Sequence, residues 1–79
     1  MRAGLLTIGD EIVDGRILNK NSQYLAEKLH QRGIDLDFML TQKDRESDIL
    51  MGLRFAKSRC QHLFITGGLG PTRRIKIHF

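Results

Sequence analysis

Two short apolar segments, each closed by a glycine, constrain the fold of this chain most strongly. Residues 3–8 form an apolar run that Gly9 ends, and residues 63–65 form a second run shortly before Gly67. Runs this brief and this sharply bounded are typical of buried strands rather than of helices. Strands that are apolar on both faces suit the interior of a parallel sheet, because helices cover both sides of such a sheet.

The residues after the first run divide into a turn and a helix. Residues 10–20 lack helical periodicity, and the Asp-Gly dipeptide at 14–15 favours a tight turn, so we expect a small hairpin-like excursion there. Asn21 and Ser22 then offer side-chain oxygens to the free amides of a helix start. Gly33 provides the left-handed stop that commonly ends a helix.

A strand and a second helix lead to the second apolar run. Residues 34–41 alternate apolar and mainly polar side chains, which predicts a strand with one buried face at a sheet edge. Asp44 or Ser47 is predicted to cap the helix that follows. The apolar stripe of that helix recurs at helical spacing: Ile49, Leu53, Ala56 and Cys60.

The order strand, helix, strand, helix, strand predicts an α/β fold with an open, mostly parallel sheet. The two apolar strands belong in its interior and the alternating strand at its edge, so we expect strand order 2-1-3. Right-handed crossovers then place the two helices on opposite faces. One helix covers three strands only thinly, and the third strand keeps an unpaired edge. A homo-oligomer is therefore expected.

Composition limits the class of protein. The formal charge of +4 comes largely from residues 73–79, which hold three of the thirteen Lys and Arg and no acid. No basic stripe with interleaved aromatic residues runs through the rest of the sequence, so nucleic acid is not an expected partner. The single cysteine, Cys60, is predicted to be a core residue and cannot form an internal disulfide. No apolar run reaches the length of a membrane span, and no signal peptide is evident, so we expect a cytoplasmic protein with no membrane partner.

Two loops leave the predicted point where the strand order reverses, which is where open parallel sheets bind ligands. The loop after the third strand is rich in glycine, so its backbone amides can approach a phosphate, with threonine hydroxyls as further donors. These candidate phosphate-binding residues are Thr66, Gly67, Gly68, Gly70 and Thr72. The loop after the first strand has Asp10 and Glu11, adjacent carboxylates that suit a divalent metal or a ribose hydroxyl.

Each half of this site also has a simpler interpretation. The glycine-rich loop can be an ordinary turn, the two acids can belong to a solvated loop, and Asn21 and Ser22 can serve only as a helix cap. The loop is neither a Walker motif nor the dinucleotide fingerprint. The three histidines are scattered, so a histidine metal site is not expected.

The two loop motifs together carry a specific resemblance. The segment TIGDEIVDGRILNKNSQYLA at 7–26, followed by ITGGLGPT at 65–72, closely resembles the amino-terminal domain of the competence/damage-inducible protein A (CinA) family. That domain belongs to the wider molybdenum-cofactor-biosynthesis group, which includes MogA, MoaB and MoeA. The resemblance covers residues 1–72, and residues 73–79 form a basic tail outside it.

The resemblance implies a three-layer α/β/α sandwich, of which this chain would be a βαβαβ half. CinA-like domains are associated with metal-dependent hydrolysis of the pyrophosphate bond of ADP-ribose, and relatives bind or adenylylate molybdopterin. Both ligands carry phosphate, and the implied cofactor is a divalent metal such as Mg²⁺. From the first loop the resemblance nominates Gly9, Asp10, Glu11, Asn21 and Ser22, and from the second it nominates Gly67, Gly68, Gly70 and Thr72.

The tail departs from the family pattern. Family members usually continue after Gly-Pro-Thr with an acidic pair, whereas this chain has Arg73 and Arg74, and family domains are about twice as long. The alternating residues 75–79 could form a strand that covers a sheet edge. Our leading hypothesis is a domain that binds the phosphate of a nucleotide or pterin. The alternatives are a truncated, catalytically inactive fragment that self-associates, and a molybdopterin-binding module.

Overall fold

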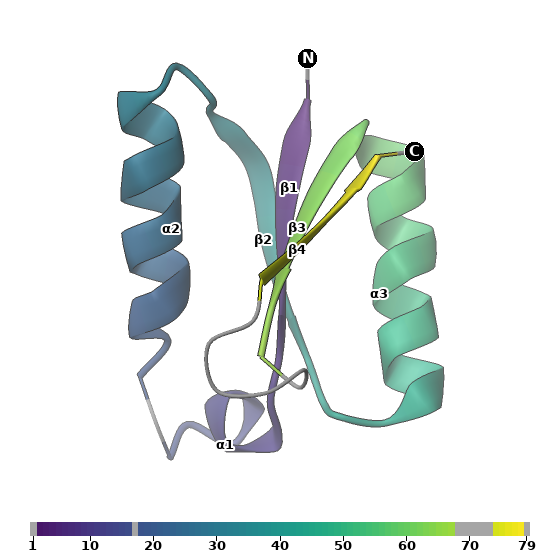
Figure 1. Cartoon of the computed structure of the whole chain (residues 1–79). Helices are drawn as coiled ribbons and strands as arrows, with labels where there is room; N and C mark the ends of the chain where they lie inside the picture. The colour runs from purple at the N-terminus through teal and green to yellow at the C-terminus, as the bar shows by residue number, and fades with distance from the viewer. Residues whose placement is uncertain (1, 17, 68–73, 79) are drawn as a thin grey trace.

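The structure, a computed structural model, describes residues 2–16, residues 18–67 and the backbone of a final strand. Three helices and four strands follow one another along these residues (Figure 1). In chain order they are β1 (Ala3–Ile8), α1 (Asp10–Val13), α2 (Lys20–Gln31), β2 (Leu36–Gln42), α3 (Glu46–Arg59), β3 (His62–Thr66) and β4 (Arg74–His78).

The four strands form one sheet in the order β2-β1-β3-β4. β1 runs parallel to both β2 and β3, so the predicted order 2-1-3 is confirmed. The prediction of an unpaired edge on β3 is wrong, because β4 pairs with β3 in the antiparallel direction. The alternating pattern of the basic tail therefore forms an added strand.

The helices α2 and α3 lie on opposite faces of the sheet, as right-handed crossovers require (Figure 1). On the α3 face, β1 and β3 provide a fully buried core that includes Leu6 and Leu63. The predicted apolar stripe of α3 packs against this core, with Ala56 and Cys60 buried and the other two members half-buried. That stripe is confirmed.

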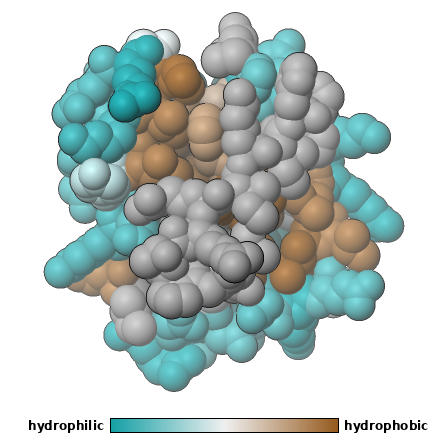
Figure 2. Space-filling model, in the orientation of Figure 1, coloured by the Kyte–Doolittle hydropathy of each residue, from teal (hydrophilic) through white to brown (hydrophobic). Residues whose placement is uncertain are grey.

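The α2 face is covered less completely. Leu29 of α2 is buried, and Ala3 and Leu5 of β1 have no exposed surface. The helix lies against β2, the edge strand, and hydrophobic side chains remain visible between α2 and the strands (Figure 2). A single helix is about 10 Å wide, whereas four strands spaced about 4.8 Å apart present a wider surface. The helix α2 therefore leaves part of this face uncovered.

Three local predictions need correction. Residues 10–13 form the short helix α1 instead of one arm of a hairpin, and the turn after it uses Gly15 at φ 79°. The cap of α2 is Asn19, not the pair that follows it, and α3 begins after Arg45. The predicted stop at Gly33 is correct, since its φ is 83°.

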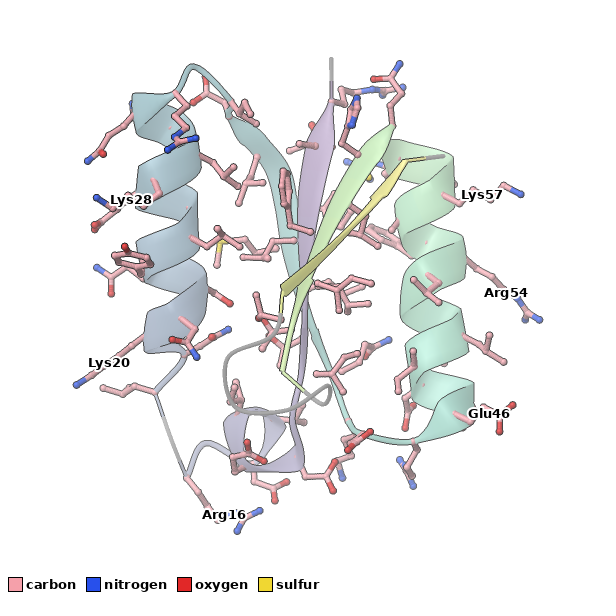
Figure 3. All side chains as sticks on the ribbon, in the orientation of Figure 1. Arg16, Lys20, Lys28, Glu46, Arg54 and Lys57 are labelled. Carbon is pink, nitrogen blue, oxygen red and sulfur yellow. The ribbon has the colours of Figure 1, made fainter. Side chains whose placement is uncertain are left out.

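Charged side chains point away from the sheet on the outer sides of both helices. Figure 3 shows Lys20 and Lys28 on α2, and Arg54 and Lys57 on α3, all directed away from the strands. These basic groups are thus divided between two opposite sides of the molecule. Among the described residues, no helix is long and apolar enough to cross a membrane.

Candidate functional site

The carboxyl ends of β1 and β3 lie side by side, and both candidate loops begin there. Thr7 and Thr66 are paired in the parallel register. Gly67 follows at φ 76°, and a Cβ atom at Gly67 would lie 2.3 Å from the carbonyl oxygen of Ile8. Only glycine allows so close an approach in a left-handed conformation. The two glycine-bounded bends therefore converge at the point where the strand order reverses.

Buried hydroxyl groups link this end of the sheet to α2. The hydroxyl oxygens of Thr7 and Ser22 are 2.5 Å apart, and those of Thr7 and Thr66 are 3.4 Å apart. All three residues are almost completely buried. Asn19 donates from Nδ2 to the Thr7 hydroxyl at 3.3 Å, while its Oδ1 accepts from the Ser22 backbone N–H at 3.2 Å.

This network positions the amino terminus of α2. Asn19 is the N-cap, and its contact with Thr7 holds the first turn of α2 against the carboxyl end of β1. The Lys20 and Ser22 N–H groups donate to the Leu18 carbonyl and to Asn19 Oδ1, so the end of α2 favours an anion through the partial positive charge of the helix amino terminus. Asn21 lies exposed on the same turn. The edge thus combines buried hydroxyls, the positive end of a helix dipole and a glycine bend.

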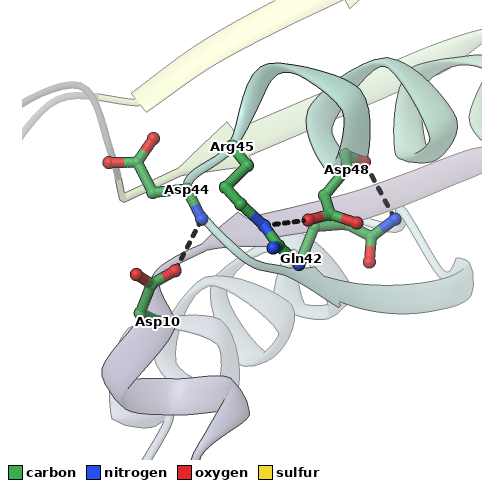
Figure 4. A network of polar contacts seen from close by, with 5 residues as sticks. All are labelled: Asp10, Gln42, Asp44, Arg45 and Asp48. Atoms are coloured by element: carbon green, nitrogen blue, oxygen red, sulfur yellow. Dashed lines mark hydrogen bonds and ion pairs between the residues drawn. The ribbon is translucent and has the colours of Figure 1, made fainter.

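The acidic corner begins one residue beyond β1. The Gly9 N–H donates to the carbonyl of Gln42 at 3.0 Å, which ties the bend to the end of β2. Asp10 is exposed, and its Oδ1 accepts a hydrogen bond of 2.8 Å from the backbone N–H of Asp44 (Figure 4). The carboxylate of Glu11 turns back toward Gly9, since a Cβ atom there would lie 3.1 Å from Glu11 Oε1.

The loop between β2 and α3 is braced by further polar contacts. Arg45 pairs with Asp48 at 2.8 Å, and Gln42 Nε2 donates to the carbonyl of Asp48 at 3.0 Å (Figure 4). This loop supplies the Asp44 amide to Asp10, so the acidic corner spans two loops of the sheet's carboxyl edge.

The described residues do not form a closed metal site. They contain no group of three His, Cys, Asp or Glu side chains that could hold a metal ion. The Asp44 amide donates to one carboxylate oxygen of Asp10, and the other oxygen makes no such bond within the described residues. Glu11 is only half-buried. Mg²⁺ commonly binds through one or two carboxylates plus water and substrate phosphates, so a third side-chain ligand is not required for an Mg²⁺ site.

The structure brings together only part of the predicted site. Thr66, Gly67, Gly9 and Ser22 meet at the carboxyl ends of β1 and β3, with Asp10 beside them. Three other predicted residues lie outside the described part of the chain: Gly68, Gly70 and Thr72.

Sequence reasoning missed two members of the network, Thr7 and Asn19. The spacing of three residues between Asn19 and Ser22, which is the usual distance from an N-cap to the amide it accepts from, is the signal that could have identified Asn19. Thr7 carried no such signal, because a threonine inside an apolar strand is common.

Cys60 lies away from this site, at the opposite end of α3. Burial raises the pKa of its thiol, with hydrogen bonding to the backbone of His62 acting in the other direction. A raised pKa keeps a thiol protonated and unreactive near neutral pH. Cys60 is therefore a core residue, as its position in the apolar stripe predicted.

The fold and the site together define a doubly wound α/β domain with its ligand edge at the carboxyl ends of the two central strands. Residues 4–74 match the family described as "Probable molybdopterin binding domain". The chain therefore belongs to this molybdenum-cofactor-biosynthesis family.

The relatives within that family are CinA-like. A CinA-like protein of Syntrophobacter fumaroxidans is 50% identical over 68 residues, which are 86% of this chain and 16% of that protein. A CinA-like protein of Fusobacterium nucleatum is 40% identical over 72 residues, 91% of this chain and 18% of that protein. The chain thus spans less than a fifth of the length of these curated relatives.

A solved structure supports the same assignment. The crystal structure of the protein CinA, of unknown function, from Thermoplasma acidophilum superimposes with a TM-score of 0.82 at 30% sequence identity. The match covers 90% of this chain and 42% of that one. The chain therefore shares the α/β architecture of that structure and is similar to one part of CinA-like proteins.

Proposed function

We propose that this domain binds a phosphate-bearing small molecule of the nucleotide or pterin type at the carboxyl edge of β1 and β3. The observation that carries the proposal is the convergence of the Gly67 bend with the Thr7, Ser22 and Thr66 hydroxyls. This buried network fixes the end of β1, the Gly67 bend and the start of α2 relative to one another, so the site needs little reorganisation to receive an anion.

Each part of the edge has a separate task in this proposal. Gly67 lacks a Cβ, so the backbone after β3 can come close to a phosphate. The amino terminus of α2, held in place by Asn19, carries partial positive charge that would attract a phosphate. Ser22 and Thr66 are buried, so their hydroxyls anchor the two walls of the site instead of reaching far into solvent.

A second step of the proposal concerns the ligand's pyrophosphate. We place a divalent cation such as Mg²⁺ at Asp10 and Glu11, where it would neutralise charge on a pyrophosphate. The family resemblance favours hydrolysis of ADP-ribose as the reaction. The chain's own residues would bind and orient the phosphates. Asp10, fastened to the Asp44 amide, would hold the acidic corner in place.

Binding is tested by thermal denaturation of the full chain with ADP-ribose or inorganic pyrophosphate, each with and without MgCl₂. A ligand at one hundred times its Kd stabilises the folded state by about 2.7 kcal/mol, which raises the Tm of a small domain by roughly 10 °C or more. Adenosine, which lacks phosphate, is the matched control. Equal shifts with adenosine and ADP-ribose, or no shift with either phosphate ligand, would contradict the proposal.

Hydrolysis needs its own measurement. Release of AMP from ADP-ribose in the presence of Mg²⁺, followed by chromatography, is expected from the wild-type chain and is expected to fall in Asp10→Asn. Binding without AMP release would keep the phosphate-binding proposal and remove the hydrolase. The molybdopterin-binding module would then be the better description.

A further inference from the structure

The strand β2 forms one margin of the sheet and has a described strand on one side only. Its neighbour is β1, and the order β2-β1-β3-β4 leaves the other side of β2 without a strand partner among the described residues. A sheet edge presents unpaired backbone donors and acceptors that can pair with another strand. Residues around β2 therefore decide whether this edge is protected or ready to associate.

Several apolar side chains in and beside β2 are exposed. Met39, at the middle of the strand, is 54% exposed, and Phe55 on the adjacent α3 is 41% exposed. The ring of Phe55 meets the ring of Phe38 edge-on, with centroids 5.3 Å apart, so the two side chains form a continuous hydrophobic margin. On the α2 side, an open groove of about 450 Å³ follows the same strand, with Ala26, Ile34 and Met39 in its lining.

Charge gives this edge a preferred partner. Asp35 precedes β2 and Lys43 follows it, so the strand has an acid at one end and a base at the other. Two antiparallel copies of such a strand bring opposite charges together at both ends. Lys43 has no ion pair with the described residues, while Asp35 contacts only the exposed ring of His30.

We propose that β2 pairs with β2 of a second copy of this chain, antiparallel and related by a two-fold axis at Met39. This register places Met39 opposite Met39 and Phe38 opposite Leu40, which share the α3 face of the sheet. At both ends it sets Asp35 of one copy near Lys43 of the other. Such an interface is isologous, so each favourable contact occurs twice.

Two registers with the axis nearer the start of β2 are less favourable. Moving the axis to residue 36 sets Asp35 opposite Asp37, and like charges directly opposite one another are destabilising. Moving it to residue 37 sets Asp37 opposite itself. In the proposed register Asp37 lies opposite Thr41, and its carboxylate is already paired with Arg59 at 3.3 Å.

The pairing differs from the association expected from the sequence, which involved the edge of β3. In the structure β4 occupies that edge. The proposal is also independent of the ligand site, because the test below uses no ligand. The partner proposed for the β2 edge is a second copy of this chain. If the partner were a different protein, the purified chain would remain monomeric.

The test reverses the charge at one end of β2 at a time. Sedimentation of the purified full chain across a range of concentrations is expected to show a monomer–dimer equilibrium. Asp35→Lys sets two lysines near one another at each end, and Lys43→Glu sets two acids near one another. Each variant is expected to weaken dimerisation by roughly tenfold to a hundredfold, because two cross-strand pairs change sign. An equimolar mixture of the two variants is expected to restore the dimer, since every end pair is again of opposite charge.

Controls separate the edge from general charge effects. Lys57→Glu makes the same change in net charge as Lys43→Glu, but on the outer side of α3, and is expected to leave dimerisation unchanged (Figure 3). Met39→Lys places two cations at the axis and is expected to give a monomer, with circular dichroism verifying that the variant is folded. A monomeric wild-type chain, a mixture that stays monomeric, or a loss equal to that of Lys57→Glu would overturn the proposal.

Discussion

Replacing Gly67 by alanine tests the geometry on which the candidate site depends. The new Cβ atom would lie 2.3 Å from the Ile8 carbonyl oxygen, well inside the 3.0 Å that real Cβ atoms keep from their neighbours. Both atoms belong to the backbone framework, so neither can rotate away. The end of β1 and the bend after β3 would have to separate by about 0.7 Å, which disturbs the packing around them.

The expected loss of unfolding free energy in Gly67→Ala has two parts. A left-handed conformation costs a residue with a Cβ about 1–2 kcal/mol, and the forced separation adds about 1–3 kcal/mol of the kind seen in overpacked sites. We expect Gly67→Ala to lower the free energy of unfolding by about 2–5 kcal/mol. A chain of this size has a total of roughly 4–12 kcal/mol, so the variant should be visibly less stable.

Gly33→Ala is the matched control for this prediction. Gly33 has nearly the same backbone conformation, with φ 83° against 76°, but nothing lies within 4 Å of the position of its Cβ. The variant Gly33→Ala should lose only the free energy of the left-handed conformation, about 1–2 kcal/mol. Urea denaturation followed by circular dichroism gives both free energies. Equal losses in the two variants would show that Gly67 does not pack against Ile8, and the convergence of the two loops would have to be abandoned.

Three further predictions concern the core and the network. Ser22→Ala removes the hydroxyl that faces Thr7 and leaves a buried partner with fewer contacts, so we expect a loss of about 1–2 kcal/mol in urea unfolding, and no change would mean that the network carries little energy. Gly4→Ala would place its Cβ 2.2 Å from the ring of Phe38, and we expect a loss of about 1–3 kcal/mol, partly relieved in the double variant with Phe38→Leu. Burial raises the pKa of Cys60 above its ordinary value of 9.0, so the unfolded chain releases this proton first and stability should fall as pH rises from about 9. The slope should disappear in Cys60→Ala, measured by denaturation between pH 7 and pH 10, and a slope that persists would assign the effect to another group.

The candidate site was predictable only in outline. The glycines at 9 and 67 mark the ends of two strands, and strand order then requires their loops to start together. The hydroxyl network was not predictable, because Thr7 and Thr66 are 59 positions apart and meet only when β1 and β3 are in register. The anchoring of Asp10 by the Asp44 amide likewise joins loops that are 34 positions apart.

Local pattern by itself determined the three parallel strands of this protein, its two long helices and the order 2-1-3 of those strands. Apolar runs, an alternating strand and a helical stripe record how much of each segment is buried, and burial dominates the choice of neighbours. Tertiary structure alone decided that α1 is a helix and that Asn19 caps α2, and it selected the β3 edge for the strand that the alternating tail had suggested. These features depend on hydrogen bonds whose partners are chosen by where the folded chain brings its loops together, and hydropathy carries no record of that choice.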